Sequence, residues 1–416
     1  MKVLIKKTPY IKGKVDISGS KNACLPILAT CLLTNEEIKV NNVPNISDVL
    51  DMLKILKYLG VDVTHSKKEK TVRLKRKGKI KTEVLLEEVK KIRASYYVIP
   101  GLLYNNEESK ILYPGGCNLG ARPIDFHLQA FKKMRVNITE EDILIFKRKE
   151  LIGNQISFDK PSVGATINTI MLASVAQGQT IISNQIIEPE ILNVITTLKL
   201  MGADIKVIKQ DIIVNGKNKL HGCQTEVIDD RIEAGSYMLL ASCIPSDLII
   251  NHIDIAYLSS VINVLKAMKV KFEVFNRSIR ILGSNCLEDV EVVTGPYPNF
   301  PTDLQQILSA CLLKTKKIST IKETIYQNRF SQILELNKMK ANIELCDGLI
   351  VIKNSILEGS KVLACDLRCG FALIVGAILA KDETIIDNFE VIERGYENII
   401  FKLKKIGIKI KELNTT

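Results

Sequence analysis

The stretch LKLMGADI, residues 198–205, has the pattern of a helix end, a tight turn and the start of a strand. A glycine just after the last apolar helical residue is a common helix stop, because glycine readily adopts the left-handed conformation. Similar stretches occur five more times, as KYLGVDV, KKMRVNI, KAMKVKF, NKMKANI and KKIGIKI. The stretch therefore marks an internal repeat.

The repeat is regular in length. The apolar residue that follows each turn occupies positions 61, 136, 203, 270, 341 and 408, so the spacings are 75, 67, 67, 71 and 67 residues. Each repeat also contains a helix of small and apolar residues, such as NACLPILATCLL or CGFALIVGAILA. Helices that are apolar nearly all round are buried. The sequence therefore predicts an α/β fold with two inside-out, barrel-like domains, each of three repeats of about 70 residues, with buried helices surrounded by sheets.

The composition limits the class of function. The chain has 416 residues, of which 46% are hydrophobic and 25% are charged, as in an ordinary globular protein. No apolar run is long enough for a membrane span, and the N-terminus has no signal-peptide pattern. The net charge is +12, but aromatic residues make up only 5% and no basic helix is apparent. We expect a cytoplasmic protein that binds neither nucleic acid nor membrane.

Ten cysteines are present, but no C-x-x-C pair gives a zinc-site spacing. Cysteines in apolar runs, such as LPILATCLL, are typical of core packing. Cys117 is different, because it lies in YPGGCNLGARPID, residues 113–125, after two glycines and before an arginine. This context favours a reactive thiol over a core residue.

Arginine is scarce, with 12 residues against 46 lysines, yet six arginines are predicted at the start of a repeat helix. Helix N-termini favour anions, and a guanidinium at the same end adds a forked donor for carboxylate or phosphate. A single such arginine is more simply explained by pairing with the preceding acid, but six in register favour an anion site. These residues are Arg93, Arg122, Arg231, Arg329, Arg368 and Arg394.

Six motifs together resemble the enolpyruvyl transferases: ISGSKNACLPILA, PGGCNLGARPID, KPSVGAT, PNFPTD, DLRCG and ERGYENI. The similarity runs from end to end, and the GSKN and PGGC…GARP motifs are the most specific. The resemblance implies two inside-out α/β domains of three repeats each, in agreement with the counted period. It also implies that the N-terminal strand joins the second domain, so we expect domains of 21–229 and of 1–20 with 230–416.

The resemblance is to the branch of this family that uses UDP-N-acetylglucosamine. It implies transfer of the enolpyruvyl group of phosphoenolpyruvate to the 3-hydroxyl of the sugar with release of phosphate, the first committed step of peptidoglycan synthesis. Phosphoenolpyruvate must be protonated at C3 while a poor nucleophile attacks C2, which calls for a positioned general acid. A thiol tuned by cations can serve. The resemblance implies that Cys117 is this acid, the site of a reversible phosphoenolpyruvate adduct and the target of fosfomycin.

The resemblance implies further site residues. Lys21, Arg122 and Arg394 would hold phosphoenolpyruvate, and Asp303 would be the base for the sugar hydroxyl, although an aspartate there is also typical of a helix N-cap. With Cys117, we expect Lys21, Asp303 and Arg394 to form the catalytic set. The other implied substrate-binding residues are Asn22, Arg93, Pro123, Ile124, Asp125, Phe126, Lys160, Ser162, Val163, Gly164, Ile325, Asp366 and Arg368. His127 would lie beside the site. A single histidine in such a position more often has a structural role than a functional one. We expect a monomer that needs no cofactor and no metal.

Two alternatives remain beside this assignment. The shikimate branch of the family would lack the PGGC thiol, so Cys117 argues against it. A non-catalytic or weakly active paralogue would bind UDP-N-acetylglucosamine as a regulator, and loss of Cys117, Lys21 or Arg394 would have indicated it. The chain departs from the family pattern at Asn299, Glu393 and Ile167, which bears on efficiency and leaves the reaction class unchanged. A dinucleotide-binding oxidoreductase is excluded, because GGCNLG has the wrong glycine spacing.

Overall fold

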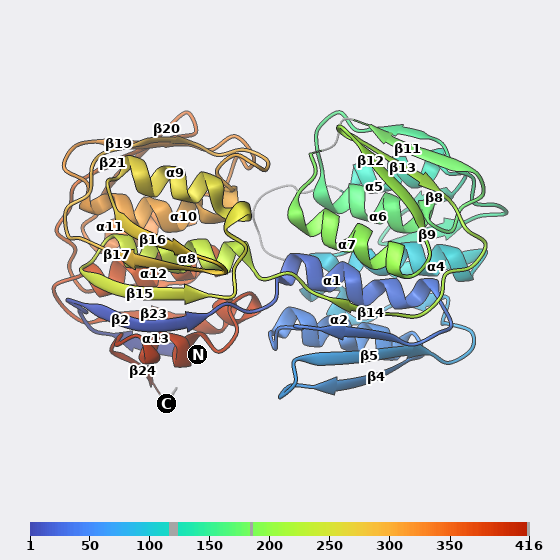
Figure 1. Ribbon diagram of the computed structural model, residues 1–416, viewed down its shortest axis with the longest axis horizontal. Helices are drawn as coiled ribbons and strands as arrows, with labels where there is room; N and C mark the ends of the chain where they lie inside the picture. Colours follow the sequence, from blue (N-terminus) through green and yellow to red (C-terminus); the bar gives the residue numbers. More distant parts are fainter. Residues whose placement is uncertain (116–123, 184–185, 414–416) are drawn as a thin grey trace. The chain divides into compact units, whose positions relative to one another are not determined.

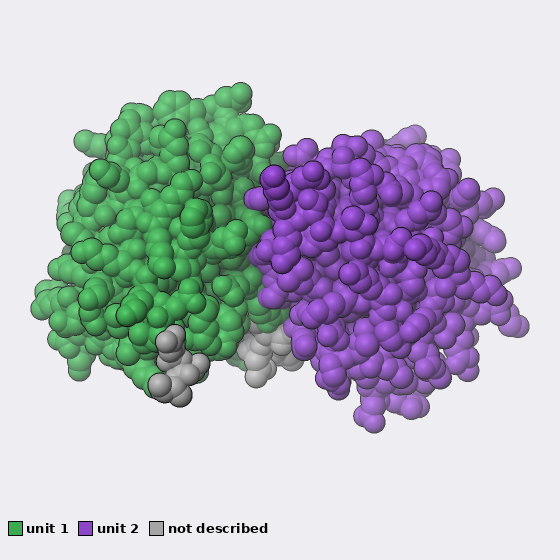
Figure 2. Space-filling model, turned by 90° about the horizontal axis from the view of Figure 1, so that it is seen from below, with its two compact units in different colours: residues 1–18, 118–120, 229–416 green, residues 19–117, 121–228 purple. Residues whose placement is uncertain are grey.

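The computed structural model describes residues 1–115, 124–183 and 186–413. The chain forms two compact units, which Figure 2 shows in green and purple. Unit 1 contains residues 1–18 and 229–413, and unit 2 contains the described residues between 19 and 228. The described site residues predicted for the first domain therefore lie in unit 2, and those predicted for the second domain lie in unit 1.

Unit 2 contains three four-stranded sheets and the helices of the first three repeats. Its helices are α1 (Lys21–Ala29), η1 (Thr30–Leu33), α2 (Ser47–Tyr58), α3 (Glu87–Lys91), η2 (Arg93–Val98), α4 (Ile99–Asn105), α5 (Asp125–Lys133), α6 (Val163–Ala173) and α7 (Pro189–Leu200). Its strands are β3 (Ile38–Asn41), β4 (Val61–Ser66), β5 (Thr71–Arg76), β6 (Glu83–Val84), β7 (Glu108–Leu112), β8 (Asn137–Glu140), β9 (Ile143–Lys147), β10 (Gln155–Ser157), β11 (Gln179–Ser183), β12 (Asp204–Ile208), β13 (Asp211–Asn215) and β14 (Cys223–Glu226).

Unit 1 has the same composition of elements. Its helices are α8 (Arg231–Ser242), η3 (Ile255–Leu258), α9 (Ser259–Ala267), α10 (Thr302–Cys311), η4 (Leu312–Lys314), α11 (Ser331–Lys338), α12 (Leu367–Leu379), η5 (Phe389–Arg394) and α13 (Ile399–Lys405). Its strands are β1 (Lys2–Ile5), β2 (Ile11–Asp16), β15 (Ser246–Asn251), β16 (Lys271–Phe275), β17 (Ser278–Leu282), β18 (Glu291–Val293), β19 (Ser319–Lys322), β20 (Asn342–Cys346), β21 (Leu349–Lys353), β22 (Lys361–Leu363), β23 (Thr384–Asp387) and β24 (Ile410–Leu413).

One strand order repeats through all six sheets of the described chain. The sheets are β14-β3-β5-β4, β6-β7-β9-β8 and β10-β11-β13-β12 in unit 2, and β2-β15-β17-β16, β18-β19-β21-β20 and β22-β23-β1-β24 in unit 1. In each, the first two strands of this order are parallel and the other pairs are antiparallel. The N-terminal strands β1 and β2, blue in Figure 1, complete two sheets of unit 1.

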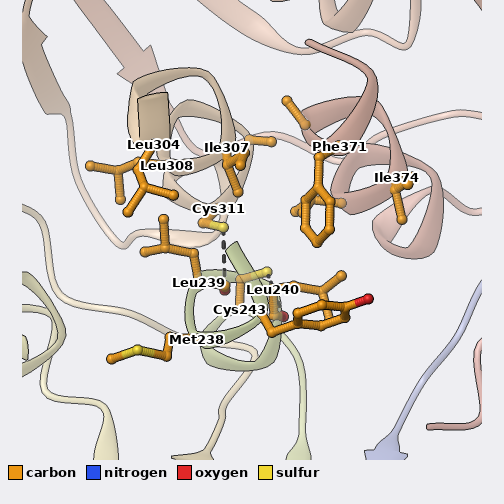
Figure 3. Close-up of a cluster of buried hydrophobic side chains, with 14 of the residues drawn as sticks. Met238, Leu239, Leu240, Cys243, Leu304, Ile307, Leu308, Cys311, Phe371 and Ile374 are labelled. Atoms are coloured by element: carbon orange, nitrogen blue, oxygen red, sulfur yellow. Dashed lines mark hydrogen bonds between the residues drawn. The ribbon is translucent and has the colours of Figure 1, made fainter. Parts of the chain in front are cut away.

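The central helices are buried, as their composition predicted. In α8 every residue except Arg231 is buried, and in α12 burial runs from Leu367 to Ile378. Figure 3 shows side chains of α8, α10 and α12 meeting, with Phe371 and Ile307 facing Leu240 and its neighbours. This packing holds the N-termini of α10 and α12, where the predicted site residues Asp303, Asp366 and Arg368 lie. The predicted inside-out architecture of buried helices surrounded by sheets is confirmed.

The cysteines in apolar runs are also in the core. Cys243 and Cys311 are fully buried, and their thiols donate to the Leu240 and Leu239 carbonyls at 3.4 and 3.3 Å (Figure 3). Burial raises the pKa of Cys311 well above its ordinary value, so this thiol stays protonated. Cys24 and Cys31 are buried in unit 2. These four act as small apolar residues.

The six marker turns share one backbone geometry. In each, the residue after the helix is left-handed: Gly60 (φ 97°), Arg135 (68°), Gly202 (93°), Lys269 (55°), Lys340 (66°) and Gly407 (94°). At the stretch quoted first, the Ala203 N–H donates to the Leu198 carbonyl at 2.9 Å, and the turns at 136, 270, 341 and 408 have the equivalent bond. This pairing is the Schellman motif. Each repeat therefore ends its second helix in the same way and then enters a strand.

We expect Gly202→Ala to lower the free energy of unfolding by about 1–2 kcal/mol, because an L side chain is strained at this φ. An added Cβ would also lie 3.0 Å from the His221 ring. Lys269→Gly, at the equivalent turn, should raise that free energy by about 0.5–1 kcal/mol by relieving the same strain. Urea unfolding of the two variants measures both changes, and equal effects of the same sign would contradict the shared geometry.

The arginine register is only partly as predicted. Arg93 and Arg231 are the first residues of η2 and α8, Arg368 is the second residue of α12, and Arg329 lies two residues before α11. Arg394 is instead the last residue of η5, so the prediction of a helix start is wrong there. The left-handed Asn398 (φ 50°) separates η5 from α13, which begins only at Ile399.

None of the helices in the described part of the chain combines the length and the apolar composition that a membrane crossing requires.

Candidate active site

Asp303 is the centre of a charged cluster in unit 1. Its Oδ1 pairs with Arg329 Nη1 at 2.6 Å, and its Oδ2 accepts from Arg368 Nη2 at 3.0 Å. Both arginine side chains are buried, with exposed fractions of 4% and 3%, whereas the Asp303 side chain is 26% exposed. The carboxylate therefore faces solvent at one side and two guanidinium groups at the other.

Burial alone would raise the pKa of Asp303, but the charges and hydrogen bonds of Arg329 and Arg368 outweigh it and hold the pKa far below its ordinary value. The group is thus ionised at neutral pH. It can accept a hydrogen bond from a hydroxyl, but a carboxylate with so low a pKa takes up a proton weakly. Its role as the base stays a prediction.

The N-cap interpretation of Asp303 is wrong. Pro301 occupies the N-cap position of α10, and Asp303 lies in the first turn. The carboxylate makes ion pairs with Arg329 and Arg368, and α10 has no side-chain cap hydrogen bond. An acid in the first turn also favours the helix dipole.

Asp366 caps the neighbouring buried helix. Its Oδ1 accepts from the backbone N–H groups of Arg368 and Cys369 at 2.9 and 3.0 Å, and its Oδ2 accepts from the hydroxyl of Ser331 at 2.9 Å. The Asp366 carboxylate therefore fixes the first turn of α12, from which Arg368 reaches Asp303. Asp366 and Arg368 were both predicted to bind substrate, and that role stays a prediction.

Two more predicted residues of unit 1 are near partners of this cluster in the sequence: Arg394 lies two residues before Tyr396, and Ile325 lies four residues before Arg329. Arg394 is half-buried and is followed by Gly395 and the buried Tyr396. The Arg368 guanidinium lies over the Tyr396 ring, 5.3 Å from its centre, and the Tyr396 hydroxyl is 2.8 Å from that of Ser236. Ile325 is 37% exposed, as several other apolar side chains of unit 1 are.

In unit 2, Lys21 is the first residue of α1 and pairs with Asp48 of α2. Their side chains are 13% and 7% exposed, and Lys21 Nζ lies 3.2 Å from Asp48 Oδ2. The ammonium group is therefore held in place by a carboxylate within its own unit. Asn22 follows in the first turn and is exposed.

A second cluster in unit 2 joins three helices. The His127 ring of α5 packs against Tyr96 of η2 at 4.4 Å between ring centres, and its Nδ1 lies 2.8 Å from Asn168 Nδ2 of α6. A Cβ at Gly164 would lie 2.5 Å from the Tyr96 hydroxyl, so only glycine fits there. This packing brings Arg93, the α5 start at Asp125 and Phe126, and the α6 start into one neighbourhood.

The N-terminus of α6 suits an anion. Ser162 caps it by accepting from the Ala165 N–H at 3.3 Å, and the first turn contains no acidic residue. Free N–H groups and the positive end of the helix dipole are suited to a diphosphate. Val163 and Gly164 form that first turn, and the exposed Lys160 lies two residues before the cap.

Several predicted residues cannot be placed. Cys117, Arg122 and Pro123 lie outside the described residues, while Ile124, next to them, is buried. Conversely, sequence reasoning missed Asp48, Tyr96 and Asn168, which no motif marked. Arg329 did carry a signal, the arginine register, but no site role was assigned to it. In the described part of the chain no cluster of acidic, histidine or cysteine side chains is arranged for a metal ion.

His127 gives the fold a pH dependence. Burial, and then the charge of Arg93, lower its pKa to about 3. An unfolded histidine binds a proton near pH 6.5, so the folded state loses stability as the pH falls from about 6.5 towards 3. We expect His127 to account for a loss of roughly 2 kcal/mol between pH 7 and pH 5.

Urea unfolding at the two pH values tests this expectation. The His127→Gln variant should show a smaller difference between pH 7 and pH 5 than the wild type. His252→Gln, which alters an exposed histidine of unit 1, should match the wild type. An unchanged difference in His127→Gln would contradict the burial argument.

The chain resembles known proteins over nearly its whole length. The family model described as EPSP synthase (3-phosphoshikimate 1-carboxyvinyltransferase) matches residues 5–403. A UDP-N-acetylglucosamine 1-carboxyvinyltransferase from Pelagibacter ubique is 41% identical over 408 residues, covering 97% of each chain. One from Halothermothrix orenii is 38% identical, covering 99% of each chain.

Solved structures show the same fold at lower identity. The enolpyruvyl transferase NikO from Streptomyces tendae superimposes with a TM-score of 0.91 at 20% identity, covering 99% of this chain and 98% of the other. An EPSP synthase from Acinetobacter baumannii gives 0.79 at 18% identity, covering 99% of both chains. The matched length and the repeated sheets agree with the relatives found by sequence, and the chain belongs to the EPSP synthase family of enolpyruvyl (carboxyvinyl) transferases.

Proposed function

We propose that this protein transfers the enolpyruvyl group of phosphoenolpyruvate to the 3-hydroxyl of UDP-N-acetylglucosamine and releases phosphate, the first committed step of peptidoglycan synthesis. The observation that carries this proposal is 41% identity over 97% of the chain to a relative named for this activity. Identity of this extent supports UDP-N-acetylglucosamine as the acceptor of the enolpyruvyl group. The structural neighbours, at 17–20% identity, support the fold alone.

The reaction divides into an addition and an elimination. In the addition, C3 of phosphoenolpyruvate gains a proton, the sugar oxygen bonds to C2, and the hydroxyl proton leaves. In the elimination, C3 loses a proton and the bond from C2 to the phosphate oxygen breaks. Cys117 serves as the acid, Asp303 orients or deprotonates the hydroxyl, and Lys21, Arg122 and Arg394 neutralise the phosphate and carboxylate.

The described geometry supports this division of roles. The α6 N-terminus, capped by Ser162 and free of acidic residues in its first turn, is suited to the diphosphate of the nucleotide sugar. The Asp303 carboxylate is ionised by its arginine partners and partly exposed, as a group that accepts a hydrogen bond from a sugar hydroxyl must be. The Ile325 side chain is 37% exposed and so is accessible to a ligand.

We further propose that the protein acts as a monomer in the cytoplasm, where phosphoenolpyruvate and nucleotide sugars are made. Neither step requires a redox centre or an electron carrier. The proton that C3 gains in the addition is lost again in the elimination, and the bond from C2 to the phosphate oxygen is replaced by a bond from C2 to the sugar oxygen.

A phosphate-release assay with two acceptors tests the function. Phosphoenolpyruvate with UDP-N-acetylglucosamine should release phosphate, and phosphoenolpyruvate with shikimate 3-phosphate should not. Release with the shikimate alone would assign the chain to the other branch of the family. Binding of UDP-N-acetylglucosamine without any release would identify a non-catalytic paralogue.

A further inference from the structure

Asp303 is held by a network that extends well beyond the implied substrate contacts. Of its two guanidinium partners, Arg368 belongs to the predicted substrate-binding residues, whereas Arg329 was marked only by the arginine register. Arg329 is 4% exposed and makes the shorter contact with Asp303, 2.6 Å against 3.0 Å. An arginine this buried must itself be held in position, since its orientation decides that of the carboxylate.

Thr302 is the next member of the network. Arg329 Nη1 donates to the Thr302 hydroxyl oxygen at 3.2 Å, and the Thr302 hydroxyl donates to Glu323 Oε2 at 2.9 Å. The hydroxyl group thus accepts from one side and donates to the other. Because a threonine hydroxyl has a single proton, the acceptor on Glu323 fixes the direction of both bonds.

The second oxygen of Glu323 organises a backbone turn. Glu323 Oε1 accepts from the N–H groups of Ile325 and Tyr326 at 2.8 and 3.1 Å. This turn places the Tyr326 ring 5.4 Å from the Arg329 guanidinium, where a cation–π contact forms. Two routes therefore lead from Glu323 to Arg329, one through the Thr302 hydroxyl and one through the Tyr326 ring.

Glu323 itself is 7% exposed and directly follows β19, which ends at Lys322. A carboxylate is costly to bury, and this one is stabilised by three hydrogen bonds to Thr302, Ile325 and Tyr326. Two of these partners belong to the predicted site or adjoin it. Thr302 precedes Asp303, and Ile325 is one of the predicted substrate-binding residues.

We propose that Glu323 is a positioning residue for this reaction, one that orients Asp303 through Thr302 and Arg329 and holds the backbone of Ile325 against the nucleotide sugar. This inference rests on the proposed function. Glu323 touches neither substrate, so it acts through two arms: an Asp303 arm, which affects the chemical step, and an Ile325 arm, which affects binding of the sugar nucleotide.

The substitution Glu323→Gln separates the two arms. The glutamine carbonyl still accepts from the Ile325 and Tyr326 N–H groups, but its amide presents donors to the Thr302 hydroxyl, whose proton then has no acceptor there. We expect kcat to fall about tenfold with little change in the KM for UDP-N-acetylglucosamine. Glu323→Ala removes both arms and should also raise that KM.

Thr302→Val removes the hydroxyl that links Glu323 to Arg329 in the Asp303 arm. Together with Glu323→Gln it forms a double-mutant cycle. Alone it should lower kcat about tenfold, and the double variant Thr302→Val with Glu323→Gln should lose about tenfold as well, because both changes break one path. Glu344→Gln is the matched control: this exposed acid forms a surface ion pair with Lys353, and its loss should leave both constants unchanged.

Steady-state kinetics of the four single variants and the double variant, with thermal unfolding of each, form the test. The network is supported if kcat falls in Glu323→Gln and in Thr302→Val and falls no further in the double variant. Multiplicative losses, near a hundredfold, or unchanged kcat with a lower unfolding temperature would overturn it. If the wild type is active and the variants keep its kcat and KM, this inference alone is refuted. If the wild type is inactive, the proposed function is refuted as well.

Discussion

The variant Cys117→Ser should lose the covalent phosphoenolpyruvate adduct and nearly all turnover. A serine hydroxyl is a far weaker acid and nucleophile than a cysteine thiol. Loss of a positioned general acid reduces rates by about 10²–10⁴-fold, and we expect kcat to fall by about 10³-fold. The adduct forms when the thiol sulfur adds to C2 of phosphoenolpyruvate and the thiol proton moves to C3.

Intact-mass spectrometry after incubation with phosphoenolpyruvate measures the adduct directly. The wild type should gain the mass of one phosphoenolpyruvate, and Cys117→Ser should gain none. The variants Cys286→Ser and Cys346→Ser serve as controls, since both alter exposed cysteines of unit 1. They should keep the adduct and the activity. An adduct that persists in Cys117→Ser, or that maps to another cysteine, would refute the assignment.

The variant Asp303→Asn should be nearly inactive and also less stable. The amide cannot neutralise Arg329 and Arg368, so two buried guanidinium groups lose their common counter-ion. We expect kcat to fall by about 10²–10⁴-fold through loss of the group that orients the sugar hydroxyl. The free energy of unfolding should fall by about 3 kcal/mol through the broken ion pairs.

Kinetics and urea unfolding together separate these two effects. Asp347→Asn makes the same chemical change at an exposed, left-handed turn position, which asparagine tolerates. This control should behave as wild type in both measurements. A stable and active Asp303→Asn protein would show that the two arginines need no carboxylate partner and that Asp303 has no part in the reaction.

The sequence predicted the architecture well because the fold repeats a local signal. The Schellman turn at Gly202 and its five relatives depend on residues within one helix end, so their spacing gave the repeat length before any contact was known. The helices of small apolar residues were predicted to be buried for an equally local reason. Such features need no knowledge of what lies on the other side of the core.

The side-chain partners could not be predicted in the same way. Asp303 pairs with Arg329 and Arg368, 26 and 65 residues away, and Glu323 reaches Thr302 across a similar distance. These contacts depend on where the sheets place the ends of β19 and α12. The same limit explains the misplaced helix at Arg394, because only the left-handed Asn398 shows that the helix starts later.

The central claim is that the chain builds an enolpyruvyl ether on UDP-N-acetylglucosamine. The most direct measurement is to follow a mixture of this protein, phosphoenolpyruvate and UDP-N-acetylglucosamine by ³¹P and ¹H nuclear magnetic resonance. We predict one inorganic phosphate for each phosphoenolpyruvate consumed, together with vinyl proton signals from an ether at the 3-oxygen of the sugar. Phosphate release with an unmodified sugar, or no consumption of phosphoenolpyruvate at all, would contradict the claim.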